Sequence, residues 1–269
     1  MIFWFSGTGN TRLVAERLAY RLGMNDCRPL SAAMLRNPSD TYVETSDIIV
    51  IWAFPTYSWG MPPVVADFIA RFSFGSGLQR ALHFMVTTCG DDMAYTDRQW
   101  RRAMHHRGLA TGGAYAVQMP NTYTLMKGFD VDSPETIASK LSAMPAMIER
   151  IAAAIHHGAR DWPIKGYSDR MKSDILIRGT FPLIKSGIIY PWFKRFAMSP
   201  KPFHHTDGCV LCGKCARECP MANITMETDG PRWAERCALC LRCYHICPRH
   251  AIAYGKTTDG KGQYIAPKE

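Results

Sequence analysis

A repeated cysteine motif near the end of the sequence constrains the fold and the chemistry of this chain most strongly. Four cysteines spaced C-x2-C-x2-C-x3-C and followed by proline occur twice, and each residue of the second copy lies 28 positions after its counterpart, as Cys237 does after Cys209. The eight residues are Cys209, Cys212, Cys215, Cys219, Cys237, Cys240, Cys243 and Cys247. Self-similarity of this kind predicts two copies of one structural unit facing each other.

The spacing within each copy is typical of ligands to [4Fe-4S] clusters. Three thiolates with two residues between neighbours wrap one corner of a cubane. The fourth cysteine comes after three further residues, is followed by proline, and binds the other cluster. We therefore expect crossed ligation. Cluster one is predicted to be held by Cys209, Cys212, Cys215 and Cys247, and cluster two by Cys237, Cys240, Cys243 and Cys219.

Disulfides and zinc are the alternative uses of eight cysteines. Disulfides are rare in the cytoplasm, where we expect this chain because its first residues carry no basic region ahead of a signal-like apolar segment. Zinc sites use C-x2-C pairs separated by longer loops rather than triplets. We therefore favour clusters, and residues 205–255 resemble a bacterial two-cluster ferredoxin domain.

Strand and helix signals alternate along the first 157 residues. Strands are predicted at 2–5, 47–53, 81–88 and 113–118, with a weaker candidate at 27–30, and helices at 11–22, 63–72, 95–108 and 134–157. This alternation predicts an α/β fold, a doubly wound five-stranded parallel sheet with helices on both faces. We expect three parts: domain 1–157, a basic, proline-containing connector at 158–203 with one or two short helices, and a small α+β domain with a polar tail at 204–269.

A glycine-containing loop joins the first predicted strand to the first predicted helix. It consists of Ser6, Gly7, Thr8, Gly9, Asn10 and Thr11. The N-terminus of a helix offers unpaired N–H groups to an anion. The loop has no P-loop lysine, and Arg12 stands where a dinucleotide fingerprint needs its third glycine. We interpret it as a site for one phosphate monoester, with an ordinary strand-to-helix turn as the alternative.

This loop resembles the phosphate loop of flavodoxins, and the order of the elements agrees. The resemblance implies FMN and two further loops around its ring, each following a predicted strand. The residues expected there are Pro55, Thr56, Tyr57, Ser58, Trp59, Gly60, Thr88, Cys89, Gly90, Asp91, Asp92 and Tyr95. Tyr57 and Trp59 offer flat faces for stacking, with ordinary packing as the alternative. For Cys89 we favour a small buried residue over a redox thiol.

The whole chain resembles the flavodoxin–ferredoxin fusion family. The resemblance implies two [4Fe-4S] clusters and FMN in a cytoplasmic electron-transfer protein that links one-electron and two-electron carriers. The expected partner is a redox protein, ferredoxin-like or an acidic oxidoreductase. A reductase of a quinone or another small organic acceptor is the alternative, and a redox-sensing module is a third.

The charge of the chain allows several partners. A formal net charge of +9 suits nucleic acid, an anionic membrane or an acidic protein. Two oxidised clusters with their thiolates and a flavin phosphate would lower it to about +3, which disfavours nucleic acid. No apolar run of spanning length occurs. Basic residues outnumber acidic ones nine to three over 160–201, and we favour a connector packed between the domains over membrane-surface contact.

Overall fold

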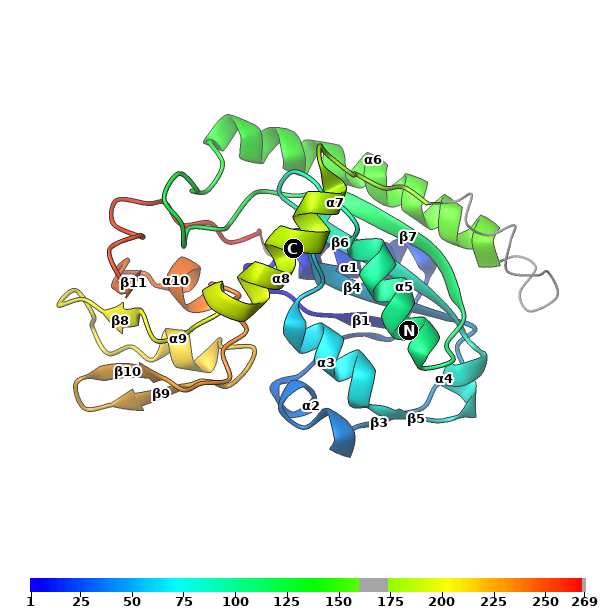
Figure 1. Cartoon of the computed structure of the whole chain (residues 1–269), viewed down its shortest axis with the longest axis horizontal. Helices are drawn as coiled ribbons and strands as arrows, with labels where there is room; N and C mark the ends of the chain where they lie inside the picture. Colours follow the sequence, from blue (N-terminus) through cyan, green and yellow to red (C-terminus); the bar gives the residue numbers. More distant parts are fainter. Residues whose placement is uncertain (160–173, 268–269) are drawn as a thin grey trace.

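Five parallel strands form the central sheet of the computed structural model, which describes residues 1–159 and 174–267 (Figure 1). The strands are β1 (Ile2–Trp4), β2 (Cys27–Pro29), β4 (Ile49–Pro55), β6 (Leu82–Cys89) and β7 (Thr111–Gln118). They lie in the order β2-β1-β4-β6-β7, which is the order of flavodoxin-like folds. The predicted doubly wound sheet is therefore confirmed, including its weakest candidate strand at 27–30.

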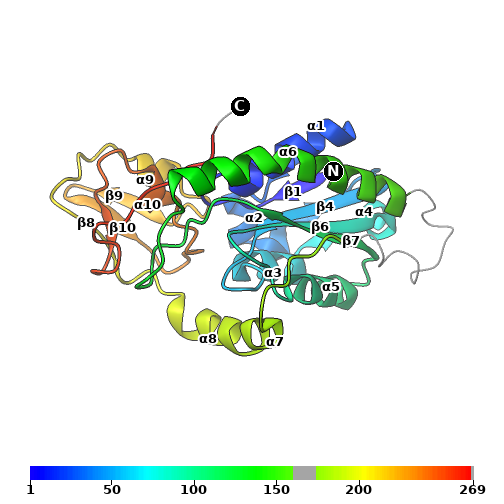
Figure 2. The same ribbon diagram turned by 90° about the horizontal axis from the view of Figure 1, so that it is seen from above.

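Helices cover both faces of this sheet. In Figure 2, α1 (Asn10–Leu22) and α6 (Pro134–Ala159) lie on one side, and α3 (Pro63–Arg71) and α5 (Thr96–His106) on the other. Short elements that the sequence did not predict follow β2 and α3. They are α2 (Ala32–Arg36), a 3-10 turn (Pro38–Asp40), β3 (Tyr42–Val43), β5 (Ser73–Phe74) and α4 (Ser76–Arg80).

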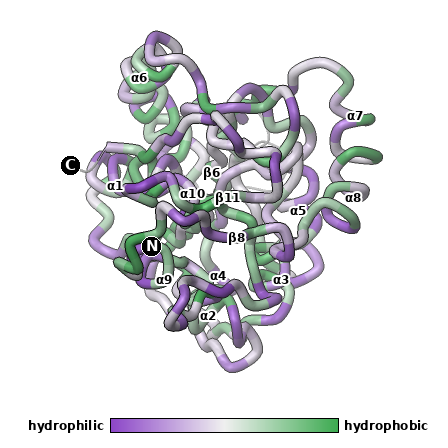
Figure 3. Tube along the Cα trace, turned by 90° about the vertical axis from the view of Figure 1, so that its left-hand side faces the viewer, coloured by the Kyte–Doolittle hydropathy of each residue, from purple (hydrophilic) through white to green (hydrophobic). Residues whose placement is uncertain are grey.

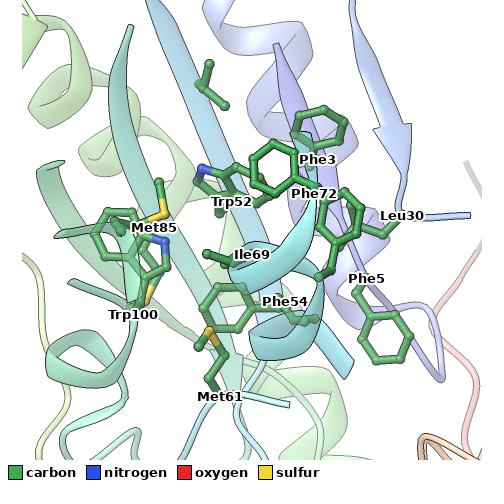
Figure 4. Packing of buried hydrophobic residues seen from close by; sticks show 14 of the residues in the cluster. Phe3, Phe5, Leu30, Trp52, Phe54, Met61, Ile69, Phe72, Met85 and Trp100 are labelled. Atoms are coloured by element: carbon green, nitrogen blue, oxygen red, sulfur yellow. The ribbon is translucent and has the colours of Figure 1, made fainter. Parts of the chain in front are cut away.

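Side chains of β4 alternate between two hydrophobic cores, one on each face of the sheet. Trp52 and Phe54 enter the core under α3 and α5 (Figure 4), whereas Ile51 and Ala53 enter the core under α1 and α6. All four are buried. This is why the strand reads as a continuous apolar run rather than an alternating one.

One buried histidine makes the stability of this domain depend on pH. His83 accepts a hydrogen bond at Nδ1 from Trp52 Nε1 at 3.0 Å, and its Nε2 lies 3.0 Å from the carbonyl oxygen of Leu78. Burial lowers its pKa from 6.5 to about 4. Below pH 6.5 the unfolded chain therefore binds a proton that the folded chain does not. Stability is full above that pH and falls as the pH drops toward 4.

We expect His83 alone to contribute a loss of about 3 kcal/mol to the free energy of unfolding across this window, since one pKa unit is worth about 1.4 kcal/mol. Chemical unfolding at several pH values measures the loss. His83→Gln should flatten the profile by this amount, whereas His105→Gln, on an exposed residue, should leave it unchanged. Parallel profiles for the wild type and His83→Gln would contradict the assignment.

The sequence repeat of the C-terminal unit is also a structural repeat. The elements β8 (Phe203–His205), α9 (Lys214–Arg217) and β9 (Ile224–Glu227) recur as β10 (Gly230–Trp233), α10 (Arg242–Ile246) and β11 (Ile252–Tyr254). Strand β8 pairs with β11, and β9 with β10, both antiparallel. The left-handed backbone positions repeat too: Leu211 and Leu239, Gly213 and Leu241, Ala222 and His250. The first pairing joins the beginning of one copy to the end of the other.

The connector joins both parts of the molecule. Ile175 bridges to Tyr115 in parallel and so extends the edge of the sheet beside β7. Residues 182–197, here called the connector helix, form a continuous helical segment in which α turns alternate with wider π turns. Its parts are α7 (Pro182–Ile184), η3 (Lys185–Ile189), α8 (Tyr190–Trp192) and η4 (Phe193–Ala197). The basic residues of 160–173 lie outside the described residues.

Candidate cofactor sites

A cavity of about 360 Å³ opens at the carboxyl ends of the central strands, where open α/β sheets bind their ligands. Its walls bring together residues from all three predicted loops: Ser6, Gly7, Thr8, Asn10, Thr11, Pro55, Thr56, Tyr57, Ser58, Trp59, Thr88, Cys89, Gly90, Asp91 and Asp92. Three predicted residues, Gly9, Gly60 and Tyr95, do not line it. The three loops therefore share one space.

The loop before α1 is shaped by its glycines and hydroxyls. Gly9 has a φ of 101° and caps α1, and its N–H donates to Ser6 Oγ at 3.2 Å. Thr11 and Thr88 share a hydrogen bond of 2.7 Å between their hydroxyls, which ties this loop to the end of β6. Thr8, Asn10 and Thr11 are buried and uncharged. Neutral donors at a helix N-terminus fit a phosphate monoester.

The C-terminal tail closes over the same loop. Ala266 N–H donates to the carbonyl oxygen of Thr8 at 2.9 Å, and the Tyr264 hydroxyl lies 3.0 Å from Asn10 Oδ1. Both tail residues are buried in the core under α1 and α6. The segment expected to be a polar tail therefore packs against the phosphate loop.

The second loop makes a tight two-residue turn. Tyr57 and Gly60 exchange backbone hydrogen bonds of 2.8 and 3.0 Å, with Ser58 and Trp59 between them in the left-handed region. Two left-handed central residues give the primed turn geometry of hairpins. Burial and the neighbouring Cys240 and Cys237 raise the pKa of Tyr57 well above its ordinary value. Tyr57 therefore stays a neutral phenol.

The third loop is held by lysines from two distant segments. Lys140 Nζ donates to the carbonyl oxygen of Gly90 at 2.8 Å, and Lys185 pairs with Asp92. Burial raises the pKa of Cys89 to about 12, which keeps its thiol protonated at neutral pH, as a small buried residue would be.

Tyr95 lies apart from the cavity. Its ring is contacted by the guanidinium groups of Arg98 and Arg178, at 3.7 and 4.8 Å from the ring centroid. Its backbone N–H donates to Ser186 Oγ of the connector helix at 2.9 Å. In this arrangement Tyr95 braces the connector rather than facing the cavity.

Several cavity residues were not predicted from the sequence. They are Met119, Pro120, Asn121, Thr122, Tyr123, Met126 and Phe129 after β7, Ile189, Trp192 and Phe193 of the connector helix, and Leu239, Cys240 and Leu241 of the second cysteine motif. The segment after β7 could have been found, because it follows the carboxyl end of a predicted strand. The residues from the connector helix and from the second cysteine motif could not have been found in this way, because they reach the cavity only where these segments pack against the sheet domain.

The structure brings the eight motif cysteines into two crossed groups. Cys209, Cys212 and Cys215 line one small cavity together with Cys247 from the second copy. Cys219 lies within electrostatic range of Cys237, Cys240 and Cys243, whose thiol pKa values are raised first by burial and further by one another. The geometry matches the expected grouping, and the ligation itself remains a prediction.

Donors around the sulfur atoms suit thiolates. The repeat places Asn223 N–H 3.4 Å from Cys219 Sγ and Ala251 N–H 3.3 Å from Cys247 Sγ. Trp233 Nε1 is buried without a hydrogen-bond partner and lies near Cys243, whose thiol pKa is raised by burial and lowered in smaller part by this indole N–H. Hydrogen bonds to sulfur are among the features that tune cluster potentials.

Among the described residues, no three His, Cys, Asp or Glu side chains converge closely enough to hold one metal ion directly. The ligands of a cubane bind four different irons and need not converge on one ion.

The second cysteine group lies against the phosphate loop. A Cβ atom added at Gly7 would lie 2.3 Å from the carbonyl oxygen of Cys240, so only glycine allows this approach. Arg242 Nη1 donates to the carbonyl oxygen of Gly7 at 3.3 Å and the same side chain pairs with Glu218. Cys240 and its two neighbouring leucines form a wall of the cavity. The loop of cluster two thus borders the space that the three predicted loops enclose.

Comparison with known families decides the nature of the cysteine-rich unit. Residues 203–252 match the family model described as a 4Fe-4S dicluster domain. The C-terminal unit is a 4Fe-4S dicluster domain. The chain therefore joins a flavodoxin-like fold, assigned from its strand order, to a 4Fe-4S dicluster domain.

Two curated relatives match a short stretch of the chain. The DNA-directed RNA polymerase subunit Rpo3 of Methanosarcina mazei is 37% identical over 71 residues, and that of Methanosarcina acetivorans is 32% identical over 71 residues. Each match covers 22% of this chain, which spans 27% of the length of each subunit.

Three solved structures are similar to about half of the chain. The Trp repressor binding protein from Bacillus subtilis (TM-score 0.34, 16% identity) covers 55% of this chain and 97% of its own. The flavodoxin of Streptococcus pneumonia TIGR4 (0.33, 19%) covers 56% and 96%. General stress protein 14 from Treponema denticola in complex with FMN (0.36, 10%) covers 59% and 98%. The fold assignment rests on the strand order rather than on these low scores.

Proposed function

We propose that this protein is an iron–sulfur flavoprotein that passes electrons between two [4Fe-4S] clusters and FMN, joining one-electron to two-electron carriers. The observation that carries the proposal is the shared wall at Cys240. This residue belongs to the group assigned to cluster two, contacts Gly7 of the phosphate loop, and lines the cavity formed by the three flavin-type loops.

Each cofactor would supply a distinct chemistry: a cluster exchanges single electrons, and a flavin exchanges electrons in pairs. The chain would hold the two cofactors in neighbouring sites. The loop from Ser6 to Thr11 would bind the phosphate, while Tyr57 and Trp59 would cover the ring. Tyr57 stays protonated because it is buried and lies beside Cys240 and Cys237. Its side chain therefore adds no negative charge next to cluster two.

Cluster one is the proposed contact point for a redox partner. Its cavity includes Cys212, which is exposed, and its lining includes Lys214 and Arg249 but no acidic residue. Val210 and Leu211 expose apolar side chains beside it. A small acidic redox protein, such as a ferredoxin-like donor, would find both charge and apolar complementarity here.

An anaerobic assay with defined donors and acceptors tests this function. The holoprotein is mixed with a reduced ferredoxin and with a viologen, and flavin and cluster absorbance are followed. Reduction of both cofactors, with the ferredoxin rate falling as salt rises, is the expected result. A flavin that no donor can reduce while the clusters turn over would overturn the proposal.

A reductase of a small organic acceptor is the second candidate. It is favoured by the aromatic residues of the cavity, since Tyr123, Phe129 and Trp192 line it together with the flavin loops. Two electrons and two protons would convert a quinone into a quinol. Adding a water-miscible quinone to the assay distinguishes the two candidates, because only a reductase turns over the quinone at a saturable rate.

A further inference from the structure

The connector helix exposes large apolar side chains to solvent instead of burying them. Six residues of this segment and its N-terminal flank are 48–71% exposed: Phe181, Leu183, Ile184, Ile188, Trp192 and Phe196. In Figure 2 the helix lies at the side of the molecule away from α1 and α6, and in Figure 3 hydrophobic (green) stretches alternate with hydrophilic ones along its turns. We call these six residues the apolar stripe.

The stripe follows from the unusual winding of the helix. Ile184, Ile188, Trp192 and Phe196 are spaced four residues apart. In a uniform α-helix this spacing drifts around the axis, but the π turns of η3 and η4 are wider and bring these residues nearly into line. A straight apolar edge is thus presented along the whole helix.

The opposite side of the helix is fixed to the body of the protein. Ser186 Oγ donates to the carbonyl oxygen of Trp59 at 2.8 Å, and the Tyr190 hydroxyl donates to that of Met61 at 2.6 Å. Phe193 is buried, and its ring lies 6.1 Å from that of Tyr123. The stripe therefore faces outward because the other side is already bonded.

The charged side chains of the connector helix and of the residues on either side of it are all basic. Residues 175–206 contain five basic and no acidic residues. Arg178 and Lys185 pair with aspartates of the sheet domain. Lys194 and Arg195 are exposed and lie over the rings of Tyr190 and Phe196, at 5.9 and 5.2 Å from the centroids. Long cationic side chains that lie along apolar groups can reach lipid headgroups.

The stripe is continuous with the rim of the cavity. Trp192 belongs to both, and Met126 and Phe129, which also line the cavity, expose apolar side chains beside Lys127. A surface that covered the stripe would therefore lie next to the mouth of the cavity.

We propose that the connector helix docks the protein on an anionic lipid surface, with the apolar stripe in the headgroup–acyl boundary and Lys194 and Arg195 at the phosphates. Such in-plane attachment needs an apolar face with basic flanks, and no described helix is long and apolar enough to cross a bilayer. A second copy of the chain suits the face poorly, because a two-fold contact would set this basic segment against itself. The proposal does not depend on which cofactors the chain binds.

Co-sedimentation of the full chain with vesicles tests the proposal. We expect binding to vesicles of phosphatidylcholine with phosphatidylglycerol, and weaker binding to phosphatidylcholine alone. Ile184→Ser/Ile188→Ser/Phe196→Ser should lower the partition coefficient at least tenfold. Lys194→Gln/Arg195→Gln should lower it only on the anionic vesicles, in a salt-dependent manner.

Tyr20→Ser/Ile48→Ser, which removes two exposed apolar side chains elsewhere, serves as the matched control and should bind as the wild type does. An unchanged far-ultraviolet circular dichroism spectrum shows that each variant has folded. Absence of wild-type binding, or equal loss in the matched control, would overturn the proposal. So would a concentration-dependent dimer in sedimentation velocity that the triple variant abolishes, since the stripe would then be a protein interface.

Discussion

Cys219→Ala is expected to remove cluster two and leave cluster one in place. Cys219 belongs to the first copy of the motif by sequence, yet it lies among Cys237, Cys240 and Cys243 of the second. Loss of one thiolate ligand opens a corner of the cubane. Iron content should fall from about eight to about four atoms per chain, and reduction of the flavin by a ferredoxin donor should fall with it.

The two clusters can be told apart by the reciprocal variant. Cys247→Ala should damage cluster one, because Cys247 lines the cavity of Cys209, Cys212 and Cys215. Iron analysis and electron paramagnetic resonance of the reduced proteins provide the readouts, with Cys27→Ala as a cysteine control outside the motifs. If Cys219→Ala instead lost the signal that Cys247→Ala loses, the crossed assignment would be wrong.

Removing two hydroxyls from the phosphate loop should release FMN while the clusters remain. Thr8→Val/Thr11→Val keeps the shape of both buried side chains and deletes two donors. A hydrogen bond to a charged group is worth about 1.5–3 kcal/mol, so the affinity for FMN should fall by roughly 10²–10⁴. Fluorescence titration of the apoprotein with FMN measures this loss, and iron content should not change.

Thr96→Val is the matched control for this variant. Thr96 is equally buried, and its hydroxyl donates to the carbonyl oxygen of Met93 at 2.7 Å, away from the cavity lining. It should cost stability without altering FMN binding. Full FMN affinity in the double variant would reject the assignment of residues 6–11 to the phosphate.

The main sheet could be predicted because its strands carry long apolar runs. Residues of β4 and β6 are buried on both faces, so their composition alone marks them as strands. Strands β3 and β5 have two residues each, too few for any periodicity. The cysteine spacing predicted more than local structure. It predicted a structural repeat, and the two copies have left-handed residues at matching positions.

The cavity was only partly predictable because much of its wall comes from docking. Ile189 and Phe193 belong to a helix whose place is set by bonds to Trp59 and Met61, far away in the sequence. The tail reads as polar, yet Tyr264 is buried against Asn10. Tyr95 matches a flavin-loop pattern, but two arginines hold its ring elsewhere. Such contacts between distant segments leave no local pattern.

The most direct test of electron exchange within one chain is its dependence on protein concentration. The clusters of the anaerobic holoprotein are reduced with less than one equivalent of a viologen radical, and cluster and flavin absorbance are followed by stopped flow. We predict that flavin reduction follows first-order kinetics at a rate independent of protein concentration.

The close approach of Gly7 to Cys240 should set this rate. Gly7→Ala, which forces the two loops apart, should slow it at least tenfold, whereas Gly187→Ala, with open space around it, should not. A rate that rises in proportion to protein concentration, or clusters that stay reduced beside an oxidised flavin, would contradict the account.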